Sequence, residues 1–292
     1  MELQITTLIE NTPDDEGRLA YEHGLSFYIE FQGKKLLFDS GQTGAFLENA
    51  EKLKKDISDI DYFLISHGHY DHSSGVMQTI EKLGQKTKML VGKDFFAPKY
   101  KLLEDGEYKY TGNPFTEAEL TERLQEKNIV LEQLDEDVKY VTDKIVIFGN
   151  FKSETGFEQH NPNFFIRQEP SCQGGVCTLG GWQQDAFREE IAIGLITDKG
   201  LVLVVGCSHV GIINILKHVK KHIDLPIYSV LGGTHLVAAD KVRLCRTVEE
   251  LEKLGLRQIA VSHCTGDEGV CMLRERFGEN FIQNNTGNVY KI

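Results

Sequence analysis

The chain has 292 residues, of which 40% are hydrophobic and 26% charged, a composition typical of a soluble globular protein with a core of ordinary size. The formal net charge of −12 argues against nucleic acid as the main partner, because a protein that tracks phosphates needs a basic face. No apolar run reaches the roughly 18 residues of a membrane span, and the first residues lack the basic start and apolar core of a signal peptide. We therefore expect a cytoplasmic protein without membrane contact.

The first half of the chain alternates predicted strands and helices, which is typical of an α/β protein. A strand at 3–10 and a turn-rich loop at 11–17 lead into a hairpin joined through Gln32-Gly33. The patterns then predict hairpin strands at 25–31 and 35–39, a helix at 44–55, an apolar strand at 62–66, a helix at 73–83 and a strand at 88–92.

The turn between the apolar strand and the following helix carries Ser66-His-Gly-His-Tyr-Asp-His72. Imidazole and carboxylate groups are ligands for zinc, iron or manganese. Alternation along the turn points His67 and His69 the same way, whereas Asp71 and His72 enter the helix and face a second metal. Three histidines and an aspartate so close together favour a metal site over a solvated polar loop.

Residues 95–185 interrupt the alternation of strands and helices. Thr116-Glu-Ala-Glu119 is a capping box that predicts a helix to about Lys127, and a strand is expected at 143–149. Residues 151–181 show little periodicity, so we expect a long loop that arches over the site. Its aromatic residues either form walls for a planar substrate or pack a small core of their own: Phe157, Phe164, Phe165 and Trp182.

The second half resumes with three consecutive strands that each end in a histidine-bearing turn. Strands at 201–205, 227–231 and 258–262 lead to Gly206-Cys-Ser-His209, Gly232-Gly-Thr-His235 and His263-Cys-Thr-Gly266. Open α/β sheets place their sites at such strand ends. A preceding strand at 191–197, helices at 212–222, 247–254 and 266–277, and a last strand at 288–292 complete a plan like that of the first half, so we expect a single domain over residues 1–292.

The six cysteines are expected to be thiols or ligands rather than structural disulfides, because the chain is expected to be cytoplasmic. Cys172 and Cys177 lie close together in a glycine-rich stretch with no second pair, which does not favour a structural zinc site there. A buried small hydrophobic role and a metal-ligand role are both open for Cys207.

The HxHxDH motif after a strand resembles the signature of the metallo-β-lactamase superfamily. Further motifs resemble one branch of it, which holds uncharacterised bacterial metal-dependent hydrolases and the archaeal dihydropterin–ribofuranosylaminobenzene phosphate synthase. These motifs are Glu22-His-Gly-Leu-Ser26, Leu37-Phe-Asp-Ser-Gly-Gln42, Gly206-Cys-Ser-His209 and Ser262-His-Cys-Thr-Gly266. The resemblance implies a four-layer αβ/βα sandwich with a one- or two-metal site at the sheet edge and an insertion around residues 95–185.

The resemblance also implies a division of the ligands. One metal is expected on His67, His69 and His209, and the other on Asp71, His72 and His263. Residues 182–191 lack the usual histidine and offer only Asp185, Glu189 and Glu190, while Cys207 stands where an aspartate is common. Either His209 replaces the missing histidine, with Cys207 near the bridging position, or one metal binds tightly and the other weakly.

Three further residues receive expected roles. Asp39 corresponds to a superfamily aspartate that orients a metal-bound histidine, although an aspartate also caps turns. His23 is either a substrate contact or a surface histidine. His235 is a ligand, a phosphate contact, an acid/base or a hydrogen-bonded neighbour of the ligands, and we take it as the donor to the leaving group.

These assignments predict a hydrolase that uses a metal-bound hydroxide on a small phosphorylated metabolite, with Asp71 accepting the proton of the attacking water. Two divalent ions are expected, with zinc as the leading candidate and manganese, iron and magnesium as alternatives. The first alternative is a transferase that condenses a dihydropterin diphosphate with an arylamine phosphate, for which the aromatic loop suits a flat heterocycle. The second is a non-catalytic metal-binding or redox-sensing protein.

Overall fold

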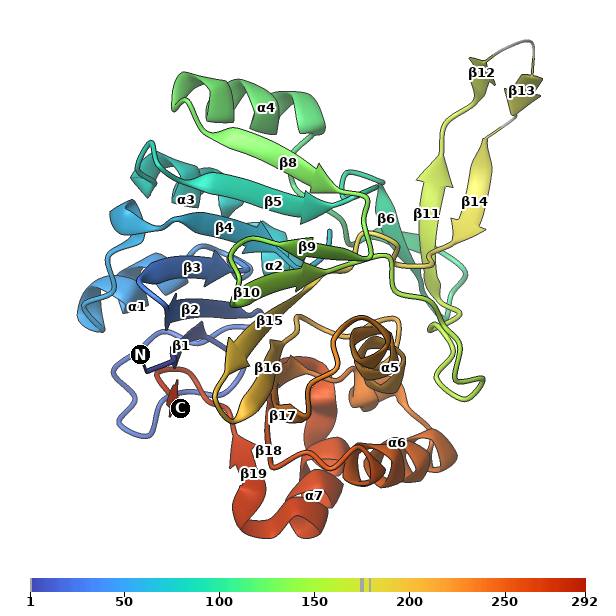
Figure 1. Cartoon of the computed structure of the whole chain (residues 1–292). Helices are drawn as coiled ribbons and strands as arrows, with labels where there is room; N and C mark the ends of the chain where they lie inside the picture. Colours follow the sequence, from blue (N-terminus) through green and yellow to red (C-terminus); the bar gives the residue numbers. More distant parts are fainter. Residues whose placement is uncertain (1, 174–175, 179) are drawn as a thin grey trace.

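The first of two large sheets is assembled from both ends of the chain. The computed structural model describes residues 2–173, 176–178 and 180–292. Strand β1 pairs with both its hairpin neighbour β2 and the last strand, β20, which brings the two termini together (Figure 1). The order is β20 (Val289–Lys291), β1 (Gln4–Ile9), β2 (Ser26–Phe31), β3 (Lys34–Phe38), β4 (Tyr62–Ile65), β5 (Lys88–Gly92) and β8 (Val130–Leu134).

The second sheet repeats this plan with the later strands. A hairpin of two antiparallel strands is followed by parallel strands, which require helical crossovers. The order is β19 (Phe281–Gln283), β18 (Gln258–Ser262), β17 (Ile227–Gly233), β16 (Gly200–Val204), β15 (Ala192–Thr197), β10 (Ile145–Phe148) and β9 (Val138–Tyr140).

Three hydrophobic clusters define four layers. One joins side chains of both sheets, such as Phe27 and Val202, so the sheets face each other. Another lies between the first sheet and its helices, and a third between the second sheet and its helices. The structure thus confirms the αβ/βα sandwich (Figure 1), whose outer helices are α1 (Phe46–Lys52), α3 (Val76–Lys82), α4 (Glu117–Glu126), α5 (Ile212–His222), α6 (Lys241–Lys253) and α7 (Gly266–Phe277).

Short helical turns lie where the parallel strands end, at the edge that carries the motifs. Because parallel strands all point their carboxyl ends to one edge, the turns after β4, β16, β17 and β18 meet there. The short elements at this edge are α2 (Tyr70–Ser73), η2 (Leu236–Ala238) and η3 (His263–Thr265), whereas η1 (Ile57–Asp59) and η4 (Gly278–Asn280) precede β4 and β19 at the opposite ends of those strands.

The inserted region is more regular than expected. Residues 151–163 are irregular, as predicted, but the expected loop then continues as strands, so that part of the prediction was wrong. A third sheet projects from the sandwich (Figure 1), with the order β14 (Gly181–Gln184), β11 (Phe164–Gln168), β6 (Lys99–Leu102) and β7 (Tyr108–Tyr110). Beyond it lies the pair β12 (Ser171–Gln173) and β13 (Val176–Thr178), in which Cys172 and Cys177 are register partners. The side chains of these two cysteines are not among those that the structure describes, so the prediction that they do not hold a structural zinc stays a prediction.

The capping box at Thr116 begins α4 as predicted, with the Glu119 backbone N–H donating to the threonine hydroxyl. Within the described part of the chain, no helix combines the length and the apolar character needed to cross a bilayer.

Candidate metal centre

The HxHxDH residues lie on the turn that connects β4 to α2. The backbone of His69 is extended and precedes the first residue of α2, so His67 and His69 sit on the turn whereas Asp71 and His72 belong to the helix. All four side chains are buried, and Asp71 is the most exposed of them at 6%. The turn therefore presents two pairs of donors in different directions, as the alternation predicts.

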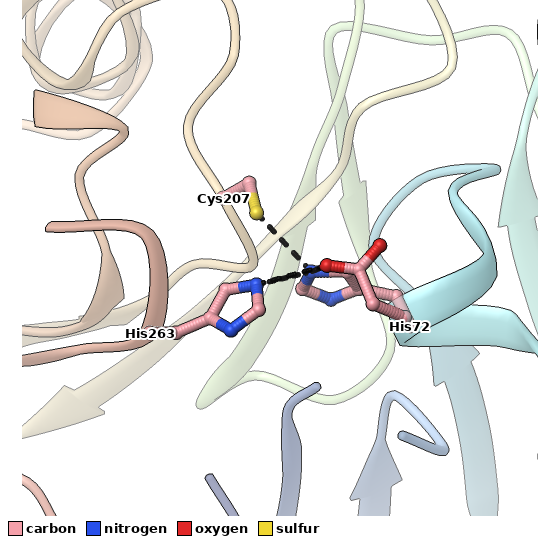
Figure 2. Close-up of side chains that lie close together, drawn as sticks. His72, Cys207 and His263 are labelled. Atoms are coloured by element: carbon pink, nitrogen blue, oxygen red, sulfur yellow. Dashed lines mark hydrogen bonds and ion pairs between the residues drawn. The ribbon is translucent and has the colours of Figure 1, made fainter. Parts of the chain in front are cut away.

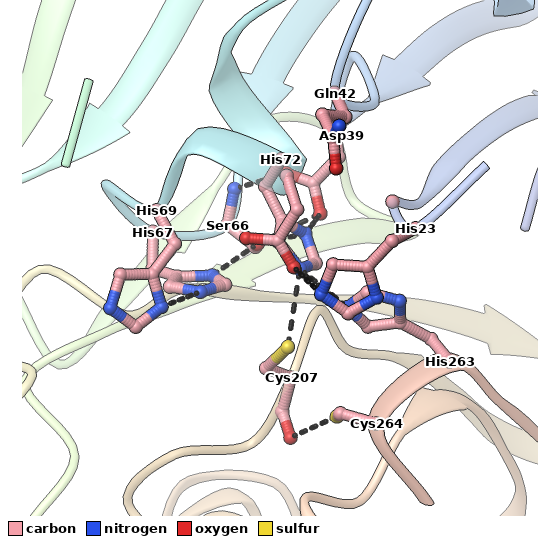
Figure 3. A network of polar contacts seen from close by, with 12 residues as sticks. His23, Asp39, Gln42, Ser66, His67, His69, His72, Cys207, His263 and Cys264 are labelled. Carbon is pink, nitrogen blue, oxygen red and sulfur yellow. Dashed lines mark hydrogen bonds and ion pairs between the residues drawn. The ribbon is translucent and has the colours of Figure 1, made fainter. Parts of the chain in front are cut away.

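The first cluster consists of the imidazoles of His67, His69 and His209 (Figure 3 shows the first two). The distance from His69 Nδ1 is 3.1 Å both to His67 Nε2 and to His209 Nε2. Burial lowers the pKa of His69 to about 3 and that of His67 and His209 well below the ordinary value. Each of the three neutral rings carries one unprotonated nitrogen, and rings this close together can turn these nitrogens toward one point, as a shared cation would require.

The second cluster brings together Asp71, His72, Cys207 and His263 (Figure 2). His72 Nε2 lies 3.1 Å from both Cys207 Sγ and His263 Nε2, and Asp71 Oδ2 lies 3.2 Å from His263 Nε2. Burial opposes charge on Asp71, but the facing imidazoles of His72 and His263 bring its pKa well below the ordinary value.

Both donor sets fit a divalent transition metal. The atoms of each cluster lie within 4.8 Å of one another and come from nitrogen, oxygen and sulfur groups, which zinc accepts in structural and catalytic sites. The donor atoms lie close together in two groups, His67, His69 and His209 in one and Asp71, His72, Cys207 and His263 in the other, and their division between two metals stays a prediction. Metal occupancy and metal identity remain predictions.

Asp39 lies directly behind the clusters. Its carboxylate accepts hydrogen bonds from His72 Nδ1 at 2.7 Å, the Ser66 backbone N–H at 2.6 Å and the Ser66 hydroxyl at 2.8 Å (Figure 3). Ser66 Oγ in turn lies 2.9 Å from His67 Nδ1. Burial would lower the pKa of His72, but the carboxylates of Asp39 and Asp71 raise it to about 9. Asp39 thus fixes the orientation of His72 and, through Ser66, that of His67.

Residues from the first loop and from the irregular segment that precedes β15 hold the turns that carry His263 and His209. Asn11 Oδ1 accepts from His263 Nδ1 at 2.8 Å, and Glu10 accepts from the His263 backbone N–H. Glu190 accepts from the backbone N–H groups of His209 and Val210 at 2.8 and 3.0 Å. We did not anticipate Glu10 and Asn11, which read in sequence only as the end of a strand and the start of a turn.

Left-handed backbone conformations concentrate at this edge. Asp39, Ser208, His235 and His263 have φ values of 66°, 61°, 47° and 56°. Each such conformation costs a non-glycine residue about 1–3 kcal/mol and persists where the surroundings over-determine it. The left-handed conformations at these four residues therefore lower the stability of the fold while they hold the side chains in place.

His235 and His23 lie beside the clusters rather than within them. The His235 ring centroid is 4.2 Å from that of His209, and its backbone N–H donates to Cys264 Sγ. His23 Nε2 is 3.3 Å from Asp71 Oδ2, and its ring stacks on His263 with centroids 5.0 Å apart. Among the described residues, His235 belongs to neither group of donors, which leaves it free to contact a substrate.

The acidic residues that replace the usual histidine turn away from the clusters. Asp185 and Glu189 clamp the ammonium of Lys99 at 2.6 and 2.7 Å, and all three side chains are at most 4% exposed. Glu189 Oε1 also accepts from the Gly68 backbone N–H at 3.4 Å. This buried triad supports the HxHxDH turn from behind, and His209 lies with His67 and His69 in the first cluster; whether it replaces the missing histidine stays a prediction.

A cleft of about 390 Å³ opens over both clusters. His69, Asp71, Cys207, His209 and His263 line its floor, with His23 and His235 beside them. Of the four aromatic residues expected as walls, Phe164 alone lines this cleft, with its ring centroid 5.0 Å from that of His69. Trp182 instead stacks on Tyr108, and Phe165 packs edge-on against the same tyrosine.

Comparison with known proteins agrees with this architecture. Residues 21–155 match the model of the metallo-beta-lactamase superfamily. The chain is 31% identical over 290 residues to the uncharacterized protein MJ0448 of Methanocaldococcus jannaschii, covering 99% of this chain and 100% of that protein. It is 29% identical to the 7,8-dihydropterin-6-methyl-4-(beta-D-ribofuranosyl)-aminobenzene-5'-phosphate synthase of the same organism, covering 99% of this chain and 96% of the synthase.

A solved structure extends the similarity to the whole fold. The crystal structure of Tm1679, described as a metal-dependent hydrolase of the beta-lactamase superfamily, superposes with a TM-score of 0.80 at 25% identity and covers 99% of each chain. Fold, motif and full-length relatives agree, and the chain belongs to the metallo-β-lactamase superfamily.

Proposed function

We propose that this protein is a metal-dependent hydrolase of a small phosphorylated metabolite. The observation that carries the proposal is that two buried donor clusters share one turn and open onto one cleft. Bound there, two divalent ions, with zinc as the leading candidate, would activate water and polarise a phosphoryl or carbonyl oxygen. A thiol donor such as Cys207 must stay reduced, which supports a cytoplasmic setting.

The surrounding side chains support distinct roles in such a reaction. Asp71 Oδ2 lies 3.2 Å from His263 and 3.3 Å from His23, so it is placed to accept a proton on the cleft side. His235 lines the same cleft next to His209 and can donate its ring N–H to a leaving-group oxygen. His23 is positioned to contact the substrate rather than a metal.

A transferase is the second candidate, and the full-length similarity to the dihydropterin-linked synthase favours it. In that reaction an arylamine would take the place of water and diphosphate would leave. The cleft also offers the ring of Phe164, against which the flat heterocycle of such a substrate could pack. The discriminating test is whether turnover of a dihydropterin diphosphate requires an arylamine phosphate or proceeds in water alone.

The first experiment is metal content per chain by elemental mass spectrometry, on protein purified without chelator and on protein refilled with zinc, manganese or iron. About two equivalents, reduced in His69→Ala and unchanged in His160→Ala, would support the two clusters. Each loaded form is then assayed on phosphoesters with and without an arylamine. Protein that takes up no metal would contradict both enzymatic readings. Protein that binds metal but turns over nothing would favour a metal-binding or redox-sensing role.

A further inference from the structure

Two lysines face each other across the inserted sheet. Lys101 on β6 and Lys109 on β7 are direct cross-strand partners, and both line the cleft above the clusters. Side chains of directly opposed residues leave the sheet on the same side, a few ångströms apart. Both lysines are exposed. Two ammonium groups therefore lie near each other at the rim of the cleft.

The register shows that this side of the sheet is the one turned toward the metal clusters. Phe164 on β11 is the cross-strand partner of Lys101, and its ring packs against His69 and His209 with centroids 5.0 and 5.4 Å apart. The sheet thus places a ring against the clusters and two ammonium groups beside that ring.

Lys99, two residues before Lys101 on the same side of β6, provides a contrast. Its ammonium is neutralised by Asp185 and Glu189. Within residues 2–173, 176–178 and 180–292, neither Lys101 nor Lys109 has an ion pair or a side-chain hydrogen bond of its own. Like charges directly opposite each other disfavour a sheet, and such local conflicts are typical of functional sites.

The charge of the cleft is opposite to that of the protein. The chain carries a net charge of −12, yet the charged residues that line the cleft are Lys101, Lys109 and Asp71. Asp71 lies at the floor, beside His263 and His23. The lining as a whole therefore carries a formal charge of +1, and its rim presents two ammonium groups to an incoming molecule.

We propose that Lys101 and Lys109 form an anion subsite for a phosphate group of the substrate that is remote from the reacting group. This inference rests on the proposed function and narrows it: the substrate carries two anionic groups, one over the clusters and one at the lysines. Leu103 and Phe164 line the cleft along with them and offer apolar contact to the body of such a molecule.

The test compares two probes, adenosine 5'-monophosphate and adenosine 3',5'-bisphosphate, by calorimetric titration of the zinc-loaded protein. The second phosphate should tighten binding about tenfold, the effect of one charge-assisted hydrogen bond. That gain should disappear in Lys101→Gln/Lys109→Gln. It should persist in Lys88→Gln/Lys291→Gln, which removes the same charge from exposed strand residues elsewhere. Metal content is measured for every variant.

Equal gains in the wild type and in the Lys101/Lys109 variant, or no gain in the wild type, would overturn the subsite. Inorganic phosphate that binds the wild type at least as tightly as the bisphosphate, and binds Lys101→Gln/Lys109→Gln more weakly, would show that the lysines hold a free ion, which also overturns the assignment to the substrate. Because the readout is binding, a lysine-dependent gain without any turnover would keep the subsite and contradict the hydrolase. Turnover without a lysine-dependent gain in affinity would support the hydrolase and contradict the subsite.

Discussion

The buried ammonium of Lys99 gives the most direct test of how the inserted sheet is joined to the metal-binding turn. Its side chain is 1% exposed and is held at 2.6 Å by Asp185 and at 2.7 Å by Glu189. Replacing it by methionine keeps the stem and removes the charge. Two buried carboxylates then face each other without a cation, close to the Gly68 backbone.

The expected loss is about 3–5 kcal/mol, the range found when one partner of a buried ion pair is removed. This is a large part of the 5–15 kcal/mol that typically stabilises a domain. The triple variant Lys99→Met/Asp185→Asn/Glu189→Gln removes all charges together and leaves amides that can still bond. It should recover most of the loss, because the penalty comes from unpaired charge rather than from packing.

The same argument also predicts how the stability difference between Lys99→Met and the wild type changes with pH. Burial already raises the pKa of Glu189, and Lys99 opposes that rise, so the Lys99→Met variant should hold this proton to still higher pH. A carboxyl whose folded pKa exceeds its unfolded value stabilises the fold below the unfolded pKa and loses that contribution as pH rises. The deficit of Lys99→Met relative to wild type should therefore shrink from pH 8 to pH 5.

The measurement is urea unfolding of the metal-free proteins at both pH values, followed by circular dichroism. Metal-free protein is used so that a change in metal affinity does not enter the free energy of unfolding. A loss below about 1 kcal/mol in Lys99→Met, or a triple variant no more stable than the single one, would refute the argument that the triad is a buried charge balance.

Three other substitutions test the proposed metal centre and the backbone that supports it. Asp39→Asn should weaken metal binding about 10- to 100-fold in chelator-buffered zinc titrations, because the amide cannot accept both the His72 and the Ser66 hydrogen bonds; unchanged affinity would contradict its orienting role. Cys207→Ser should lose one metal equivalent and the thiolate-to-cobalt absorption of cobalt-loaded protein; retention of that absorption would exclude Cys207 as a ligand. Gly75→Ala should lower the free energy of unfolding by about 1–3 kcal/mol, because its Cβ would lie 2.1 Å from the Ser40 carbonyl oxygen; an unchanged urea midpoint would refute this.

The motifs and the superfamily resemblance that they carry were sufficient for the sandwich, whereas the division of the donors between two metals stays a prediction. Apolar strands followed by histidine-bearing turns recur at 67–72, 207–209 and 263, and strand ends converge by topology alone. The inserted sheet was missed, both in β6 and β7 and beyond residue 163, because its strands are short and mostly exposed. Their aromatic residues face one another across strands, as Tyr108 and Trp182 do, so they lack the apolar face by which a buried strand is recognised.

The supporting residues could not be found because their roles depend on contacts distant in sequence. Lys99 meets the carboxylate of Asp185 86 residues later, and Asn11 meets His263 across 252 residues. A lone lysine on a strand or an asparagine in a turn has no local signature of such a role. The empty histidine position before β15 was visible, but only the fold shows that Glu190 reaches the backbone of His209 from there.

The residues that line the cleft come from two different parts of the sequence, and this affects how such a protein can evolve. Every donor of the two clusters comes from outside residues 95–185, whereas Lys101, Lys109 and Phe164 come from within them. On the proposed function and the proposed subsite, reaction chemistry and molecular recognition lie in separate stretches of the chain. The inserted sheet could then be rebuilt, strand by strand, while the groups proposed to act on the substrate keep their positions. One edge of the fold would in this way serve a succession of different metabolites.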